Sequence, residues 1–85
     1  MSDLQKQFDA AAADSKNLDE RPDNLTLLNI YALYKQGSAG DVHGDSPGFT
    51  DMIARAKYDA WAKLKGLSRD DAMRQYVDLI DSLKG

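Results

Sequence analysis

Two tyrosines and a lysine that fall close together are the residues best suited to chemistry: Tyr31, Tyr34 and Lys35. On a helix, positions 31 and 35 lie one turn apart on the same face, and position 34 adjoins them. Such a group can hold an anion, because the ammonium supplies charge, a phenol supplies a directed hydrogen bond and its ring supplies a stacking plane. The same spacing is also typical of a tyrosine-rich edge of the core along which a lysine stem lies. Spacing alone leaves both interpretations open.

A second group of cations follows later in the chain, where Arg55 and Lys57 precede Tyr58. Side chains two positions apart diverge around a helix, so these two could flank a polyphosphate or form a solvated helical face. Lys16 and Arg21 lie on either side of the first expected connection between helices. They could extend a positive rim.

Catalysis and metal binding are not favoured by the residue types present. His43 is the only histidine, and no serine–histidine pair is held in place around it, so it is interpreted as a solvated loop residue. Cysteine is absent, and residues 41–45 lack the ligand spacing of a calcium-binding loop. We therefore expect no catalytic residue, no metal site and no cofactor.

The composition indicates a single domain over residues 1–85. The chain has 85 residues, of which 42% are hydrophobic, and this suffices for one core but not for two. The net charge is −3, whereas general nucleic-acid binders carry a basic excess, so nucleic acid is an unfavoured partner. The polar N-terminus does not resemble a secretory signal, and no apolar run approaches the roughly 20 residues of a membrane helix. The expected location is cytoplasmic.

Hydrophobic periodicity predicts four helices and no strand, and hence an all-α fold. The expected helices run from about Ser2 to Leu18, from about Asp23 to Gln36, from Thr50 or Asp51 to Leu64, and from Ser68 to about Leu83. The second is apolar almost all round, which predicts a central position with neighbours on several sides.

Glycines and caps mark the expected boundaries between these helices. Gly37 and Gly40 are predicted to end the second helix and to open a long loop that reaches Gly48. The pair Ser68 and Asp71 predicts a capping box at the start of the fourth helix. In the third helix, the buried stripe is predicted to consist of Ile53, Ala56, Ala60, Trp61 and Leu64.

Taken in order, these segments resemble the acyl-CoA-binding protein family over essentially the whole chain. The matching residues are Phe8-Asp9-Ala10-Ala11, Tyr31-Ala32-Leu33-Tyr34-Lys35-Gln36, Gly40-Asp41, Pro47-Gly48, Ala56-Lys57-Tyr58-Asp59-Ala60-Trp61, Gly66-Leu67-Ser68, Asp71-Ala72-Met73 and Tyr76-Val77. Any one fragment is weak by itself, but this many in one order and spacing make the resemblance specific.

The resemblance implies a four-helix up-down-down-up bundle that holds a fatty acyl-CoA ester with its acyl tail in a groove. The family's Y-x-x-Y-K motif falls on Tyr31, Tyr34 and Lys35, and its A-K motif on Ala56 and Lys57. By this match, Tyr31, Lys35 and Lys57 hold the ribose 3′-phosphate and the neighbouring nucleotide. Further ligand contacts are implied for Tyr34, Tyr76, Ala12, Lys16 and Leu28.

Two residues depart from the family pattern. Tyr58 stands where relatives commonly have tryptophan, and Ile53 stands where they often have a basic residue. The first change keeps an aromatic ring of another size, and the second removes one contribution to the positive rim. Affinity and chain-length preference are the properties that these departures affect.

The resulting hypothesis is a non-catalytic, monomeric carrier and buffer of medium- to long-chain fatty acyl-CoA, without stable membrane insertion and in transient contact with acyl-CoA-using enzymes. One alternative is a protein-interaction module whose tyrosine face docks a helix, for which the sequence gives no positive signal. Another is an enzyme such as a thioesterase or CoA isomerase, which would need a base or nucleophile that the sequence does not offer.

Overall fold

The computed structural model of the chain describes residues 3–48 and 50–84, and these ranges contain helices and no strands. The predicted all-α fold, with a long loop between the second and third main helices, is confirmed. The predicted start of the first helix at Ser2 lies outside the described residues. The elements, in chain order, are α1 (Asp3–Asp14), the short 3-10 helix η1 (Ser15–Asn17), α2 (Asn24–Ala39), α3 (Met52–Ala62) and α4 (Arg69–Leu83).

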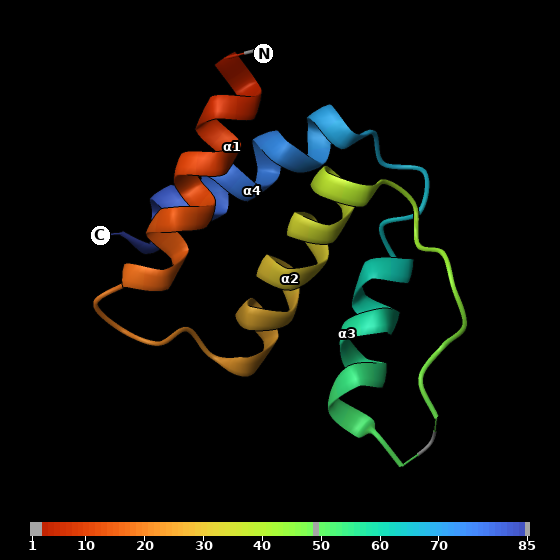
Figure 1. Cartoon of the computed structure of the whole chain (residues 1–85). Coiled ribbons are helices and arrows are strands. Elements are labelled where there is room, and N and C mark those ends of the chain that lie inside the picture. The colour runs from red at the N-terminus through yellow and green to blue at the C-terminus, as the bar shows by residue number, and fades with distance from the viewer. Residues whose placement is uncertain (1–2, 49, 85) are drawn as a thin grey trace.

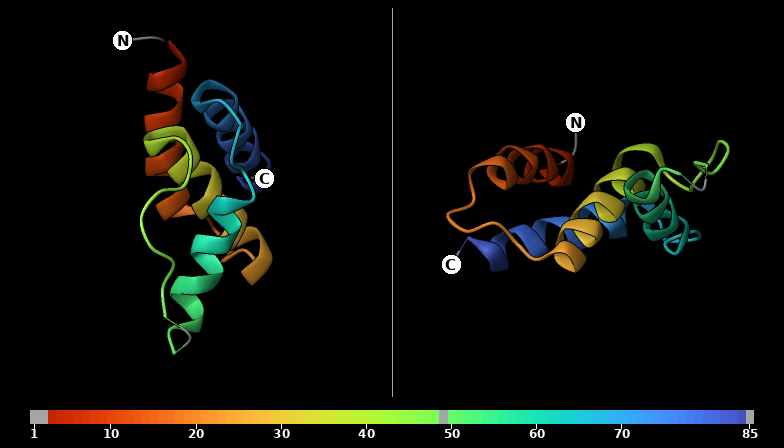
Figure 2. Two further views of the ribbon diagram at one scale, coloured as in Figure 1. Left: turned by 90° about the vertical axis from the view of Figure 1, so that its right-hand side faces the viewer. Right: turned by 90° about the horizontal axis from the view of Figure 1, so that it is seen from below.

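The four main helices follow the expected up-down-down-up course. In Figure 1, α1 and α4 run downward, whereas α2 and α3 run upward beside each other. The seen-from-below view in Figure 2 places α2 between α3 on one side and the α1–α4 pair on the other. The predicted central position of α2 is therefore confirmed. No helix in the described part of the chain combines the length and hydrophobicity that crossing a bilayer requires.

Side-chain caps fix where three of the helices begin. Asp23 accepts a hydrogen bond from the Thr26 amide (2.7 Å), and Asp51 accepts one from the Ala54 amide (3.1 Å). Ser68 likewise accepts one from the Asp71 amide at 3.1 Å, which is the serine half of the predicted capping box. Each of these bonds satisfies an amide that the first turn of a helix leaves without a partner.

The end of α2 differs from the prediction, because Gly37 lies inside the helix. The helix continues to Ala39, and Gly40, with a φ of 83°, forms the cap. Gly37 is buried against α1 and α4: a Cβ placed on it would lie 3.1 Å from Cε1 of Phe8 and 3.2 Å from Cγ of Met73. The glycine is thus required by close packing between helices and not by a turn.

The main core lies where α4 packs against α1 and α2. Its buried side chains include Phe8, Met73, Tyr76 and Ile80. The ring of Phe8 stacks on that of Tyr34 with centroids 5.4 Å apart and meets that of Tyr76 edge-on at 5.1 Å. Such pairs add a preferred geometry to the hydrophobic stabilisation of burial. The cluster fixes the positions of α1, α2 and α4 relative to one another.

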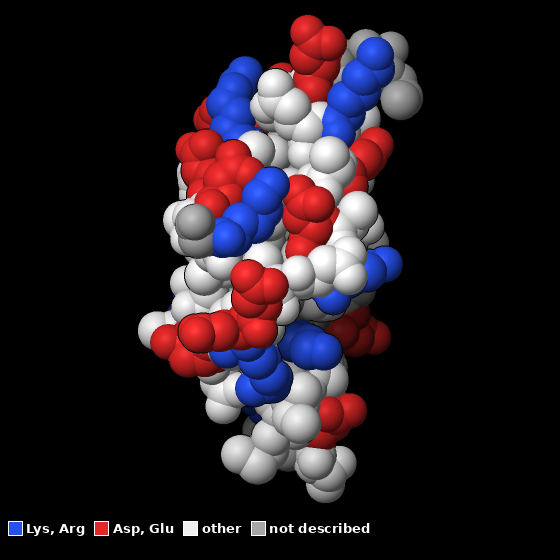
Figure 3. Space-filling model, turned by 90° about the vertical axis from the view of Figure 1, so that its left-hand side faces the viewer, with Lys and Arg blue, Asp and Glu red and all other residues white. Residues whose placement is uncertain are grey.

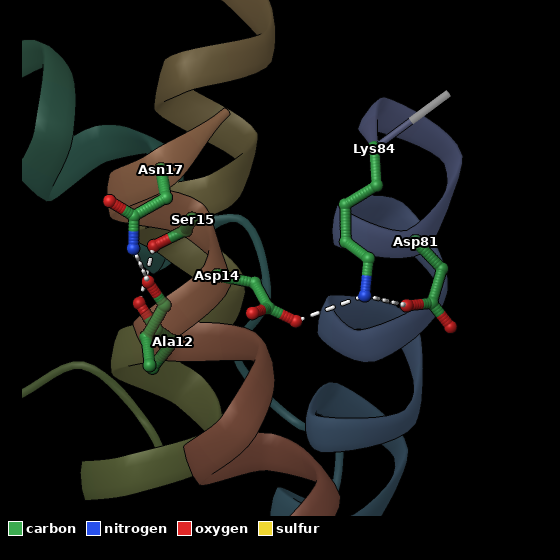
Figure 4. A network of polar contacts seen from close by, with 7 residues as sticks. Ala12, Asp14, Ser15, Asn17, Asp81 and Lys84 are labelled. Carbon is green, nitrogen blue, oxygen red and sulfur yellow. Dashed lines mark hydrogen bonds and ion pairs between the residues drawn. The ribbon is translucent and has the colours of Figure 1, made fainter. Parts of the chain in front are cut away.

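The end of α1 is joined to the end of α4 by Lys84 (Figure 4). Its ammonium bonds Oδ2 of Asp14 at 3.0 Å and lies 3.6 Å from Oδ1 of Asp81. The hydrogen bond and negative charge of Asp14 raise the pKa of Lys84. The α-helix stops earlier than the predicted Leu18, because the Ser15 and Asn17 side chains donate to the carbonyls of Ala12 and Ala13 as the chain passes into η1.

The third helix packs on α2 and is held by the long loop. Nε1 of Trp61 donates to the Gly40 carbonyl at 2.9 Å, and the Tyr58 hydroxyl donates to the Gly44 carbonyl at 2.9 Å. Trp61 is buried, as predicted, whereas Ile53 is 73% exposed. The assignment of Ile53 to the buried stripe is wrong because, among the described helices, α3 lies at the edge of the bundle and packs mainly on α2 (Figure 1).

Asp41, in the same loop, joins three segments. One oxygen of its carboxylate, Oδ1, accepts a hydrogen bond from the amide of Gly66 and another from Nε2 of Gln36, each at 2.9 Å. The same Gln36 nitrogen donates to the Leu67 carbonyl at 2.7 Å. These bonds fix the loop and the turn between α3 and α4 to the end of α2.

Candidate ligand groove

A half-open groove of about 800 Å³ lies between α2 and α3 and reaches the end of α1. We call it the first groove. Its lining combines basic and phenolic side chains with aliphatic ones and consists of Ala12, Ser15, Lys16, Arg21, Asn24, Leu27, Leu28, Ile30, Tyr31, Tyr34, Met52, Ile53, Ala56, Lys57 and Tyr76. This volume is in the range of pockets that enclose small organic ligands.

The charged residues of the first groove are all basic. Lys16 approaches it from η1, Arg21 from the connection that leads to α2, and Lys57 from α3. All three are exposed. Since the lining contains no carboxylate, the groove offers an anion a locally positive site on a protein whose net charge is −3.

Tyr31 and Lys57 come together from different helices. The Lys57 ammonium lies 5.4 Å from the centroid of the Tyr31 ring, within the range of a cation–π contact. This contact brings a phenol of α2 and a cation of α3 to the same wall of the first groove. The contact joins one residue from each of the two groups noted in the sequence, Tyr31 from the first and Lys57 from the second.

Lys35 is the one predicted ligand residue that does not line the first groove. Its ammonium lies 4.9 Å from the centroid of the Trp61 ring. The His43 ring meets the same indole edge-on, with centroids 5.3 Å apart. His43 is therefore exposed but packed, and not the fully solvated loop residue that the sequence suggested.

Tyr76 is the most buried residue in the lining of the first groove. The residue is 2% exposed, and its ring lies 5.8 Å from that of Tyr34. Burial raises the pKa of the Tyr76 phenol, a hydrogen bond with the Ser15 side chain opposes this rise, and the adjacent Tyr34 phenol adds to it. The Tyr76 hydroxyl consequently stays protonated at neutral pH and can donate a hydrogen bond to a ligand.

The aliphatic part of the lining was only partly anticipated. Leu28 was predicted as a ligand contact, and Ala12, with its small side chain, allows close approach on the α1 side. Met52 was not predicted as part of the lining, and Ile53 was considered there only as the replacement of a basic rim residue in the family pattern. They are 79% and 73% exposed and form the lip of the groove at the start of α3. Helical periodicity gives no signal for them, because it does not distinguish an apolar residue in the core from one at an open groove.

Comparison with known proteins gives one consistent result. Residues 5–80 match the family model described as Acyl CoA binding protein. The chain is 47% identical over 81 residues to an acyl-CoA-binding protein homolog of Manduca sexta, covering 94% of this chain and 90% of that protein. It is 49% identical over 76 residues to acyl-CoA-binding protein homolog 1 of Caenorhabditis elegans, covering 89% and 88% respectively.

Solved structures agree with the sequence comparison. The crystal structure of acyl-CoA-binding protein 2 of Oryza sativa matches with a TM-score of 0.90 and 35% identity, covering 94% of this chain and 89% of that one. The solution structure of the yeast acyl coenzyme A binding protein matches with a TM-score of 0.73 and 41% identity, covering 89% and 88%. The arrangement of α1 to α4 is thus shared with structures of this kind.

Proposed function

Because the chain belongs to the acyl-CoA-binding protein family, we propose that it binds fatty acyl-CoA esters in the first groove and carries them without converting them. One observation supports this most directly: basic and phenolic side chains share a single groove with exposed aliphatic ones. A CoA ester has the matching composition, because phosphates lie at one end and a hydrocarbon chain at the other.

The phosphorylated nucleotide is assigned to the wall that carries Tyr31 and Lys57. The Lys57 ammonium can exchange its contact with the Tyr31 ring for a charge-assisted hydrogen bond to a phosphate, while the Tyr31 hydroxyl donates another. Lys16 adds positive charge from the α1 side, and Tyr76 donates from the floor. In this proposal Lys35, one helical turn beyond Tyr31, leaves the Trp61 ring and joins the 3′-phosphate.

The acyl chain is assigned to the aliphatic part of the first groove. Leu27, Leu28, Met52 and Ile53 offer apolar surface there, beside the small side chain of Ala56. Burial of hydrocarbon contributes about 0.8 kcal/mol per methylene, so ten sheltered methylenes would contribute roughly 8 kcal/mol before the ligand's ordering costs are subtracted. Most of the affinity is therefore expected to come from the tail and most of the specificity from the head.

A carrier needs no further chemistry than this. It lowers the concentration of free ester, which is detergent-like, and releases the ester to the enzymes that use it. We expect the protein to act as a monomer in the cytosol and to contact such enzymes only transiently.

Isothermal titration calorimetry tests the proposal with three ligands: hexadecanoyl-CoA, free CoA and free hexadecanoate. The ester should bind far more tightly than either half, because it alone engages both parts of the groove. Equal affinity for all three would contradict the proposal. Incubation with hexadecanoyl-CoA followed by mass spectrometry should recover the ester unchanged, and turnover would show an enzyme instead.

A further inference from the structure

A second groove of about 790 Å³ adjoins the first on the neighbouring faces of α2 and α3 and extends to α4. Two residues, Leu28 and Ala56, line both grooves. Along α2, the first groove is lined by Asn24, Leu27 and Tyr31, whereas the second is lined by residues 25, 29 and 32, which lie on an adjacent face of the helix. Leu28 and Ala56 therefore lie on the boundary that the two grooves share.

The second groove has the wrong charge for a phosphate. Its lining includes two carboxylates and one ammonium, those of Asp59, Asp78 and Lys63. The rest of its lining is mostly aliphatic and includes Leu25, Leu64 and Leu79. An uncharged hydrocarbon suits such a surface, because carboxylates near a phosphate would repel it.

Three of the largest exposed apolar side chains stand at one end of both grooves. Leu25 is 70% exposed and lines the second groove, while Met52 and Ile53 are 79% and 73% exposed and line the first. Since α2 and α3 run in the same direction, their first turns lie at the same, lower end of the molecule (Figure 1). Figure 3, which views the left-hand side of the molecule in Figure 1, shows acidic and basic side chains interspersed along most of that surface and a lower end that is mainly uncharged.

We propose that the distal methylenes of a long acyl chain pass around this apolar end, from the first groove past Met52, Ile53 and Leu25, and lie in the second groove. This inference rests on the proposed function, since it takes the CoA head to be bound in the first groove. The proposed path gives the three exposed side chains a common role, because an acyl chain that follows it covers all of them. Only acyl chains that are longer than the first groove extend into the second groove.

The path of the chain can be mapped by photo-crosslinking. Hexadecanoyl-CoA with a diazirine on its terminal carbon is irradiated with the full-length protein, and the modified residues are identified by mass spectrometry. We expect adducts at Leu25, Leu64 or Leu79. Octanoyl-CoA with the same terminal group is the matched control, and its adducts should be confined to the first groove.

Two exposed positions supply a matched pair of variants. Leu25→Gln should weaken hexadecanoyl-CoA binding by about fourfold for each methylene that loses its shelter, and should leave octanoyl-CoA binding unchanged. Ile53→Gln should weaken the binding of both esters, because Ile53 belongs to the first groove. Circular dichroism should show the same helix content in both variants as in the unchanged protein.

Hexadecanoyl adducts confined to the first groove, or no protein adduct despite calorimetric binding, would overturn the proposed path. A Leu25→Gln variant that binds hexadecanoyl-CoA as tightly as the unchanged protein would do the same. In each of these cases octanoyl-CoA still binds, so the proposed function stands. If neither ester binds, the proposed function fails as well, and the two failures are thereby distinguished.

Discussion

The ammonium of Lys57 lies 5.4 Å from the centroid of the Tyr31 ring and so joins α3 to α2 along one wall of the first groove. Lys57→Ala removes the cation, and we expect the dissociation constant for hexadecanoyl-CoA to rise about 10- to 100-fold, as for the loss of a hydrogen bond to a charged group. Tyr31→Phe keeps the ring and should cost less, up to about tenfold. Calorimetry measures both effects, and circular dichroism should show unchanged helicity.

Lys65→Ala is the control for this pair. Lys65 follows the same helix and is exposed, but it lines neither groove. Its loss should change affinity little. If Lys57→Ala and Lys65→Ala weaken binding equally, general electrostatic attraction and not a built site holds the ligand. Loss of helix content in both Lys57→Ala and Tyr31→Phe would show that these residues serve the fold instead.

The contact between Lys35 and Trp61 gives an optical signal for the proposed move of Lys35 to the phosphate. Trp61 is the only tryptophan, and the Lys35 ammonium lies 4.9 Å from the centroid of its ring. Adding hexadecanoyl-CoA should change the tryptophan emission, because the cation leaves the ring. In Lys35→Met, which keeps most of the side-chain stem, the ligand-free emission should already differ and the ligand-induced change should be smaller.

Lys57→Met controls for indirect effects, since Lys57 contacts Tyr31 and not the indole. At saturating ligand this variant should show the full change in emission. An emission spectrum that hexadecanoyl-CoA leaves unaltered in the unchanged protein would mean that Lys35 stays over Trp61.

Gly37 should resist substitution although it lies within a helix. Alanine would gain up to about 1 kcal/mol in helix propensity. However, its Cβ would meet the Phe8 ring at 3.1 Å and Met73 at 3.2 Å, and such overpacking typically costs about 1–3 kcal/mol. We expect Gly37→Ala to lower the free energy of unfolding by about 1 kcal/mol net, measured by urea denaturation.

Gly48→Ala is the matched control, because nothing lies within 4 Å of the added Cβ there. Its unfolding free energy should stay within about 0.5 kcal/mol of the original. A Gly37→Ala variant that is more stable than the original chain would show that the Phe8 and Met73 side chains can move away from the added methyl group at little cost in free energy.

The stability of the fold should depend on the charge of Asp41. The hydrogen bond from the Gly66 amide, followed by that from Gln36, lowers the pKa of this carboxyl group. Because the folded pKa is depressed, the stabilisation is present above the pKa of the unfolded chain, about 3.9, and is lost as the pH falls through the folded value. Asp41→Asn should therefore have a lower Tm than the original chain at neutral pH.

The difference in Tm should narrow below pH of about 4 and vanish in stronger acid, where both side chains are neutral. Asp45→Asn changes the same charge in an exposed part of the same loop and should shift Tm little. If the difference in Tm between Asp41→Asn and the original chain stayed the same in acid, the ionised form of Asp41 would not be what stabilises the loop.

The sequence predicted what depends on local pattern. Helix existence and order followed from periodicity, and Ser68 followed from its capping preference, because both are encoded within a few residues. The resemblance to a family added the ligand residues, and all of them except Lys35 line the first groove.

The errors concern contacts between segments that lie far apart in the chain. Gly37 is read locally as a helix stop, yet its role comes from Phe8 on another helix. Ile53 has the periodicity of a core residue, and only the position of α3 at the edge of the bundle leaves it exposed. Lys35 lies on the expected helix, but its side-chain direction depends on Trp61, twenty-six positions away. Contacts of this kind can be identified only when the packing of the helices against one another is known.

The parallel course of α2 and α3 sets a minimum length for the segment between them. The chain must travel back along α3, whose 11 residues span about 16 Å at 1.5 Å per residue. An extended strand of about five residues covers that distance. Residues 40–51 are more than this minimum. The additional length lets the backbone bend so that the carbonyls of Gly40 and Gly44 accept hydrogen bonds from Trp61 and Tyr58. A shorter segment would therefore lose the hydrogen bonds that attach it to α3 before it became too short to connect the two helices.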